Sequence, residues 1–519
     1  KFVAGTKSLN LWAGHSLENS KSSISKHELF NFPDHQLNRE QSYNNADNRK
    51  SEEYVQASIS NRGKKHIWML RGGVAWNERR NRITNGITSY WQTEASTCND
   101  NLLSINNRNN YFRPSIYYYG LHNFSNTKSF GYFIDSYYSR NDHNRLYNED
   151  DASFQSKVKE NYYYTQANAN YSISFKNKSR LSFNLFEFLR VSASKYAGTS
   201  AFHQNLHSSE TILFTDYSLH SGRFFFGICP GLSFLTYRLI GMKAINHLTP
   251  RFQYRISFMI DKAQQLQITF ALGNTFPKIN TINNVEQQID PVIVLKGNPK
   301  MDNSILLNPR LNYTLHLYKL ALQIGTSYFY QNHSIVSDYY IRDKHLINAF
   351  RDGCIYHCPS TDLSITYKPT NSLNMKLSGL WNEHLIRGGV EHHHLSSIFG
   401  TAIINYYVGN FSFSTSLTTP SRDLIDSQIH RKKFWQYQLS AMWNRGNWAV
   451  EAKANNLFMT KNHIMDKLSV PYYSFKQTER NSNFNQYATL KIVYSLDYGK
   501  KTSKAPCYEH KNSESAILK

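Results

Sequence analysis

The sequence predicts an all-β protein, a transmembrane antiparallel β-barrel with short turns at one end and long loops at the other. Apolar and polar residues alternate along nearly all of the 519 residues, a period that separates them onto opposite faces of a sheet. Short polar turns also alternate with long polar stretches. No run approaches the roughly 18–20 consecutive apolar residues of a membrane helix, whereas a spanning strand needs an apolar residue only at every second position.

The hairpin from Arg251 to Leu272 shows the alternation most clearly. Five apolar residues at every second position form one face: Phe252, Tyr254, Ile256, Phe258 and Ile260. The residues between them are Arg251, Gln253, Arg255 and Ser257. After the polar turn at 261–265 the same rhythm resumes. One face is therefore apolar, and the other carries charges and amides that a dry core could not hold unpaired.

The connections between such segments alternate in length. Short ones are expected near 61–65, 123–128, 176–180, 220–223, 261–265, 318–320, 368–372, 408–410 and 444–447. Long polar stretches fall at 15–53, 78–110, 140–160, 194–210, 276–305, 335–360, 383–396, 420–433 and 459–486. This is the arrangement of outer-membrane barrels, which have short periplasmic turns and long extracellular loops. A soluble sandwich gives no reason for such strict alternation.

Counting the hairpins predicts about 20 strands, from a first near Lys7–Ala13 to a last near Gln486–Tyr498. Barrels of about 22 strands enclose a plug. We therefore expect residues 1–498 to form a barrel that is incomplete at its N-terminal side, without one opening hairpin and without the plug. Residues 499–519 are expected to be a polar, disordered C-terminal tail.

The composition favours an outer-membrane location. Aromatic residues make up 14% of the chain, with 36 tyrosines, and Tyr and Trp gather at membrane interfaces. The formal net charge is +22, but no zinc finger, helix-turn-helix or RNA-binding signature accompanies it, so no nucleic acid is expected as a partner. Outer-membrane lipid and anionic lipopolysaccharide are the expected neighbours.

Three short stretches resemble motifs of a known family. In the first, Pro277 follows a strand, and a box before the next strand contains Gly297, Asn298 and Pro299. The second is Asn456, Leu457 and Phe458. The third is the alternating row that ends at Tyr498. They resemble the "GNPNL" box, the "NLF" element and the terminal strand of TonB-dependent outer-membrane receptors, specifically of their outer membrane β-barrel family. Lys300 stands where the box usually has Asn.

The resemblance implies a receptor and transporter barrel in the cell outer membrane. Such a barrel takes up a large ligand, for example a siderophore, glycan, cobalamin or peptide. The TonB complex supplies the energy through a plug that this sequence does not show, and the barrel-assembly machinery reads the terminal strand. Two other readings stay open: a surface barrel for assembly or adhesion, and a passive pore.

Nothing in the sequence resembles a catalytic constellation, so no enzyme activity and no cofactor are expected. There is no HExxH, no G-x-S-x-G and no phosphate-binding glycine loop. His392, His393 and His394 are weak candidates for metal ligands, because consecutive loop residues converge only in part. The residues that would contact a ligand cannot be named from the sequence.

Overall fold

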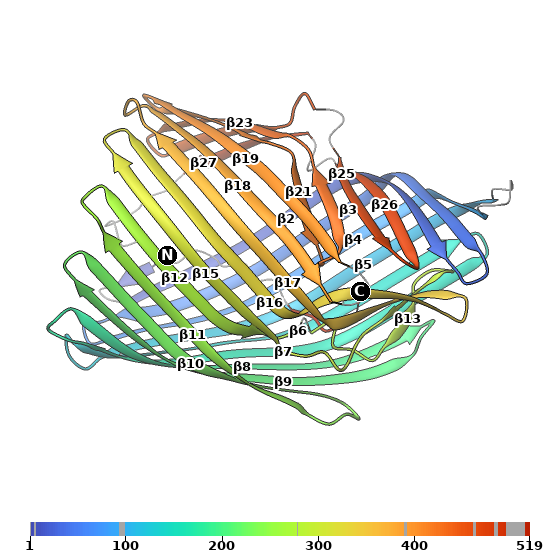
Figure 1. Ribbon diagram of the computed structural model, residues 1–519, viewed down its shortest axis with the longest axis horizontal. Coiled ribbons are helices and arrows are strands. Elements are labelled where there is room, and N and C mark those ends of the chain that lie inside the picture. Colours follow the sequence, from blue (N-terminus) through green and yellow to red (C-terminus); the bar gives the residue numbers. More distant parts are fainter. Residues whose placement is uncertain are drawn as a thin grey trace.

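A single β-sheet curls into a barrel wall (Figure 1). The computed structural model describes all residues except 1, 5–6, 93–98, 278, 389–391, 460–462, 482–485, 495–513 and 519. Over these described residues the sheet holds 27 strands. In the same part of the chain, no helix is long and apolar enough to cross a membrane. The predicted fold class, an all-β antiparallel barrel, is confirmed.

The strands of the first half are β1 (Phe2–Ala4), β2 (Lys7–Asn31), β3 (Gln36–Arg62), β4 (His66–Gln92), β5 (Asn99–Asn123), β6 (Lys128–Glu149), β7 (Ala152–Ser174), β8 (Ser179–Gly198), β9 (Phe202–Ser221), β10 (Phe224–Leu239), β11 (Ile245–Met259) and β12 (Gln264–Thr275). Those of the second half are β13 (Glu286–Gln288), β14 (Ile293–Lys296), β15 (Ser304–Leu317), β16 (Leu320–Arg342), β17 (His345–Tyr367), β18 (Leu373–Arg387), β19 (His393–Val408), β20 (Phe411–Thr418), β21 (Ser421–Ile425), β22 (Ile429–Lys433), β23 (Gln436–Arg445), β24 (Trp448–Asn455), β25 (Ile464–Val470), β26 (Tyr473–Asn481) and β27 (Tyr487–Tyr494).

The 27 strands exceed the number expected from the sequence because several wall strands are interrupted. β20 continues into β21 across Pro420, which lacks the N–H that a ladder needs. β22 and β23, β24 and β25, and β26 and β27 are likewise consecutive parts of the wall. When each such pair is counted once, and β1, β13 and β14 are set aside, the described residues form 20 wall strands.

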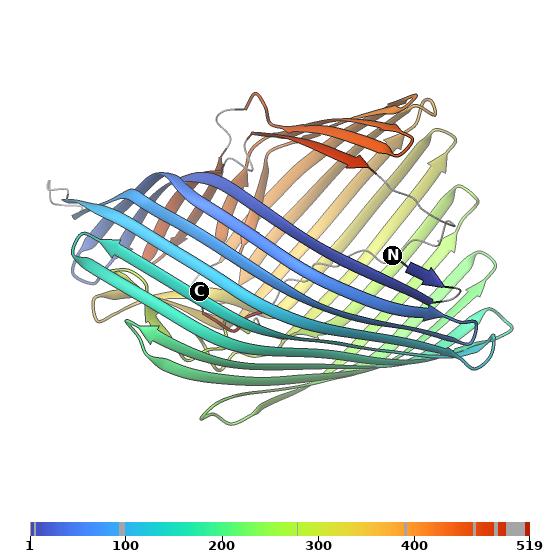
Figure 2. The same ribbon diagram turned by 180° about the vertical axis from the view of Figure 1, so that it is seen from behind.

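The wall closes where its first and last strands meet. β2 pairs with β26 from Ser22 opposite Asn481 to Phe30 opposite Tyr473. Nearer the short turns, the described part of β27 pairs with β24, and β1 pairs with β2. Figure 2 shows the red end of the wall lying apart from the first, blue strand on that side. The ladder that closes the barrel therefore covers its extracellular half in the described residues.

The short turns lie where the sequence predicts them. They join β3 to β4 at 63–65, β9 to β10 at 222–223, and β23 to β24 at 446–447. The polar stretches differ from irregular loops, because most of their length continues the strands. The stretch 15–53 is strand except for residues 32–35. Polar side chains on both faces do not prevent pairing, so these segments extend the wall beyond the membrane as hairpins.

The two faces of the wall differ as the alternation predicts. In β2 the outward row includes Leu11, 62% exposed, and Leu17, 50% exposed. The inward row is polar, and Asn10 there donates a hydrogen bond to Ser58 of β3 at 3.4 Å. Exposed apolar residues on the outside and polar residues on the inside are the pattern of a barrel surrounded by lipid.

Aromatic pairs mark the extracellular border of the apolar outer band. The rings of Trp76 and Phe112 lie 5.5 Å apart on neighbouring strands. Beyond them Arg108 forms an ion pair with Glu78 at 2.9 Å. On both strands the side chains change from aromatic to charged within a few residues. Such a change is typical of a membrane interface.

Candidate functional site

The long connection at 276–303 folds into the extracellular half of the barrel. It contains the β13–β14 hairpin, and β14 adds in parallel to β17, with Ile293 opposite Leu346. Six of its apolar side chains are almost fully buried: Ile279, Ile282, Val285, Val292, Ile293 and Met301. A connection on the outer surface could not bury so many side chains. We call this connection the inner loop, and the space it enters the vestibule.

The inner face of the wall supplies the other half of this core. Ile282 and Met301 of the inner loop pack with Tyr162, Leu206 and Tyr237. On the opposite side, Val292 and Ile293 pack with Phe30 of β2 and Tyr473 of β26. Burying such side chains contributes roughly 1.5–3 kcal/mol each relative to leaving them exposed. The hydrophobic core of this barrel thus lies in the vestibule and not along the whole lumen.

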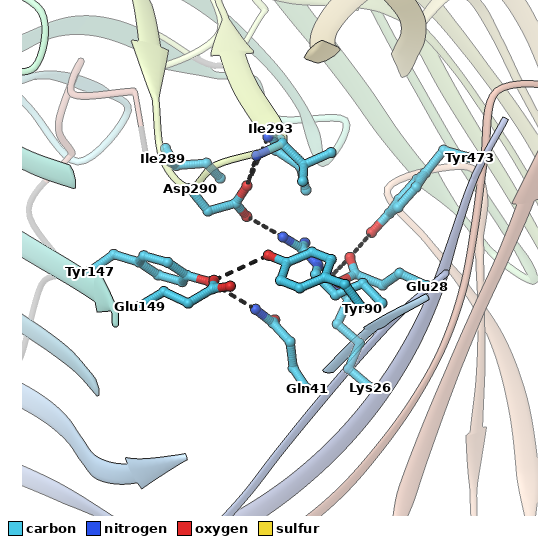
Figure 3. Close-up of polar contacts among 12 residues, drawn as sticks. Lys26, Glu28, Gln41, Tyr90, Tyr147, Glu149, Ile289, Asp290, Ile293 and Tyr473 are labelled. Atoms are coloured by element: carbon cyan, nitrogen blue, oxygen red, sulfur yellow. Dashed lines mark hydrogen bonds and ion pairs between the residues drawn. The ribbon is translucent and has the colours of Figure 1, made fainter. Parts of the chain in front are cut away.

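A buried ion network ties the inner loop to the ladder that closes the barrel (Figure 3). Arg39 of β3 lies 2.6 Å from Glu28 of β2 through Nε and 3.0 Å from Asp290 of the inner loop through Nη1. The hydroxyl of Tyr473 of β26 donates to the same Glu28. Lys26 adds a second cation at 2.6 Å. Three separate segments therefore meet around one carboxylate.

The network lies above the apolar outer band, and its charges are buried. Arg39 is 1% exposed and Glu28 is not exposed at all. Burial alone would raise the pKa of Glu28, but Arg39 and Lys26 outweigh it and hold this pKa at about 2. The carboxylate is therefore charged at neutral pH. Removing one partner from such a buried pair typically costs about 3–5 kcal/mol.

Asp290 is also built into the turn of the hairpin. Its Oδ1 accepts hydrogen bonds from the backbone N–H groups of Val292 and Ile293, each at 2.8 Å. Arg145 of β6 donates to the carbonyl of Ile289 at 2.8 Å. The turn between β13 and β14 is thus held to the wall from two sides, by β3 and by β6.

A second group of polar residues continues the network along the wall. Tyr90 donates to Glu149 at 3.1 Å, and Gln41 donates to Tyr147 at the same distance (Figure 3). Tyr147 donates to Glu149 as well. These residues come from β3, β4 and β6 and are satisfied by one another, so their burial beneath the inner loop carries little penalty.

The first sequence motif positions the inner loop. Gly297 is buried, and a Cβ built there would lie 2.3 Å from the carbonyl oxygen of Asn283. The side chain of Asn298 donates to the carbonyl of Phe350 of β17 at 3.0 Å, and its Oδ1 accepts from the N–H of Lys300 at 2.9 Å. Pro277 is buried and Pro299 is half-buried. These positions hold the inner loop in place.

The second motif forms a corner of the wall between β24 and β25. Asn456 is fully buried at a φ of 48°, a left-handed conformation that Asn tolerates better than most residues. Its Oδ1 accepts from the backbone N–H of Tyr437 at 2.7 Å. Leu457 and Phe458 point outward, the latter 83% exposed. Tyr498, the last motif position, lies outside the described residues.

The histidines do not converge. His392 and His394 are exposed, and His394 contacts Glu383. His393 lies on the opposite face of the strand, with its ring 6.2 Å from that of His430. Over the ranges that the structure describes, no group of three or more His, Cys, Asp or Glu side chains could hold a metal ion.

Residues 514–518 differ from the disordered tail expected from the sequence. They lie in the vestibule, and Ala516, Ile517 and Leu518 are at most 1% exposed. Ala516 belongs to the same apolar cluster as Ile282 of the inner loop. In the sequence, Ala516, Ile517 and Leu518 follow a polar stretch, and these three apolar residues could have indicated a buried segment. For residues 514–518 the structure shows buried side chains where disorder was expected, because average composition hides a short apolar segment.

Comparison with known proteins gives one family and several similar structures. Residues 243–494 match the outer membrane protein beta-barrel family. No curated protein sequence matches the chain. The siderophore receptor PirA from Pseudomonas aeruginosa has 12% identity and a TM-score of 0.53, over 89% of this chain and 80% of that one. The ferric preacinetobactin receptor BauA from Acinetobacter baumannii has 9% identity and a TM-score of 0.54, over 90% and 80%.

A third structure has the same architecture. The ferric-catecholate import receptor Fiu from K12 E. coli has 6% identity and a TM-score of 0.56, over 89% of this chain and 82% of that one. At such low identities the likeness concerns the fold alone.

Proposed function

We propose that the chain is a TonB-dependent receptor barrel of the cell outer membrane and that it imports a large ligand with energy supplied by TonB. The match of residues 243–494 to the outer membrane protein beta-barrel family and the similarity in fold to the siderophore receptor PirA support this proposal. The ligand classes that fit are a siderophore, a glycan, cobalamin or a peptide. The chain acts as a receptor and transporter, without catalytic chemistry of its own.

The inner loop, anchored inside the extracellular half of the barrel, is the observation that carries this proposal. The inner loop packs against β6 to β10 on one side and is paired through Asp290 with Arg39 on the other. A passive pore needs a permanently open lumen, whereas a receptor needs a closed entrance that opens when a ligand is moved through it. The anchored inner loop supports the second.

The lumen below the vestibule is suited to a hydrated ligand. A cavity of about 410 Å³ there is lined by Asp216, Gln253, Arg255 and Arg310, among others. Arg310 is paired with Asp362 at 2.6 Å. Side chains of both charges and several amides give a polar wall along which a ligand keeps hydrogen bonds as it moves. TonB is proposed to act through a plug domain associated with this lumen.

Lipopolysaccharide is proposed as a neighbour on the outer face. Arg49, Arg80 and Arg108 stand directly opposite one another on β3, β4 and β5, and all three are exposed. They lie just beyond the pair of Trp76 and Phe112. Guanidinium groups in a row match the spacing of several phosphates better than single cations do. Strand β27, which ends at Tyr494, is proposed as the region that the barrel-assembly machinery recognises.

Uptake in a deletion strain tests the proposal. The strain is complemented with the gene and supplied in turn with ferric siderophores, cobalamin, glycans or peptides as the sole source. Uptake of one class, lost in a strain without TonB, is the expected result. Uptake that persists without TonB, or steady open-channel conductance of the purified protein in planar bilayers, would instead indicate a passive pore.

A further inference from the structure

Residues 514–518 occupy a site on the inner face of the wall, where they form hydrogen bonds with β6, β7 and β8. The Oε2 atom of Glu514 accepts from Tyr162 at 2.8 Å and from Arg190 at 3.0 Å. The backbone N–H of Leu518 donates to Tyr196 at 3.2 Å. An acidic side chain and a main-chain amide are thus recognised at opposite ends of the segment.

Glu160 of β7 is the centre of this site. It is 1% exposed, and Asn141 and Ser192 donate to it at 2.6 Å and 2.7 Å. The hydroxyl of Ser515 and the backbone N–H of Ala516 add two further donors, each at 2.7 Å. A carboxylate this deeply buried needs several donors, because an unpaired buried charge is costly. The segment supplies half of these four hydrogen bonds.

The apolar side chains of the segment fill two separate clusters. Ala516 packs with Tyr137, Tyr162 and Leu206. Ile517 packs with Val158 and Tyr196. The wall offers one carboxylate for a main-chain amide, one cation for a carboxylate and two apolar recesses. These features complement an extended peptide better than a sugar or a metal chelate.

The site has room beyond the segment and touches the inner loop. A cavity of about 240 Å³ next to Ser515 and Ile517 is lined by Asn77, Arg79 and His143, among others. Asn283 of the inner loop donates to Tyr196 at 3.0 Å and to the carbonyl of Ala516 at 3.5 Å. Whatever fills the site therefore also contacts the loop that closes the vestibule.

We propose that this is a peptide-binding site, occupied in the resting protein by the chain's own residues 514–518. Its ligand is an extended peptide with a carboxylate side chain followed two residues later by a small residue and then by aliphatic ones. Such a peptide competes with the internal segment and takes over its main-chain contact with Asn283 of the inner loop. The inference deepens the proposed function by naming the ligand class, and it rests on that function only in taking the vestibule as the entrance.

Binding of a labelled synthetic peptide with the sequence of residues 512–519 tests the site. The full chain carrying Ile517→Asp, which cannot bury an unpaired carboxylate, should release its own segment and bind the peptide at least tenfold more tightly than the wild type. In the wild type the tethered segment competes at a high effective concentration. Ile517→Val is the matched control and should behave as the wild type. Adding Glu160→Gln to Ile517→Asp should weaken binding at least tenfold.

Two outcomes would overturn the inference: equal binding by the wild type and the Ile517→Asp chain, or equal binding of a scrambled peptide. If the variant does not fold, hydrogen exchange of the wild type decides. The amides of Ala516 and Leu518 should be protected, and an excess of the peptide should abolish that protection. The measurements need no TonB, so their failure is distinct from a failure to transport.

Discussion

Nη1 of Arg39 and Oδ2 of Asp290 lie 3.0 Å apart inside the barrel, although Arg39 is on the second wall strand and Asp290 is at the tip of the inner loop. Through Glu28 the same arginine also reaches the ladder between β2 and β26. One guanidinium thus couples closure of the wall to the position of the loop.

Replacing Asp290 by Asn should release the hairpin of β13 and β14. The change leaves Arg39 buried and short of a counter-charge, which costs about 3–5 kcal/mol for a pair of this kind. Limited proteolysis within residues 276–303 should become at least tenfold faster, and planar-bilayer recordings should show new channel openings. Asp343→Asn, at a residue whose side chain is 90% exposed, is the control and should change neither. An unchanged cleavage rate would contradict the anchoring role.

The pH response of the inner loop should depend on Glu286. Hydrogen bonds from Arg342, opposed by partial burial and reinforced by Lys296, lower the pKa of Glu286 to about 2. Its ordinary value is 4.5, so the stabilisation is fully present above about pH 4.5 and is lost as the pH falls towards 2. Proteolysis by an acid-active protease should therefore accelerate across that window. Glu286→Gln should remove the Glu286 contribution, and the same acceleration in the variant would refute this assignment.

Gly297 should tolerate no side chain. The Cβ of an alanine would lie 2.3 Å from the backbone oxygen of Asn283, and a backbone atom cannot move aside as a flexible side chain can. Gly297→Ala is expected to lower the yield of heat-modifiable barrel and to expose the inner loop to protease. Gly379→Ala is the matched control, because a Cβ there meets no atom within 4 Å. Equal behaviour of the two variants would count against the close approach.

Asn456 should be more sensitive to Ala than to Gly. Its φ of 48° disfavours an alanine by roughly 1–2 kcal/mol, whereas glycine adopts it freely. Both variants lose the hydrogen bond to the N–H of Tyr437, which contributes about 1 kcal/mol. The urea midpoint in detergent should fall for both, and further for Asn456→Ala. The reverse order would show that backbone conformation is not what this position selects.

The short turns and the face of each wall residue could be predicted because both follow from a local period of two. The inner network could not, because its partners are far apart in sequence: Glu28, Asp290 and Tyr473 meet only through the closure of the barrel. Lys26 and Glu28 lie on the same face of β2, and this pair of opposite charges was the only local sign of the buried ion network. The length of the extracellular hairpins was hidden because strand pairing there does not require alternation.

The second motif shows a similar division. The sequence stretch from Asn456 to Phe458 is visible as a pattern, but its role as a corner depends on the backbone of Tyr437, which belongs to the neighbouring hairpin arm. A family resemblance therefore predicts where such a feature lies, and the structure supplies what it does.

Lipid covers the apolar outer face of the wall, and the free energy of unfolding in bilayers tests this most directly. Leu232 is in the outward row of β10 and is 50% exposed, while Gln253 on neighbouring β11 faces the lumen. Leu232→Arg should cost about 2–4 kcal/mol in lipid vesicles, and Gln253→Arg should cost little. A Leu232→Arg variant as stable as the wild type, together with a strongly destabilised Gln253→Arg variant, would show that the faces are reversed and contradict the claim.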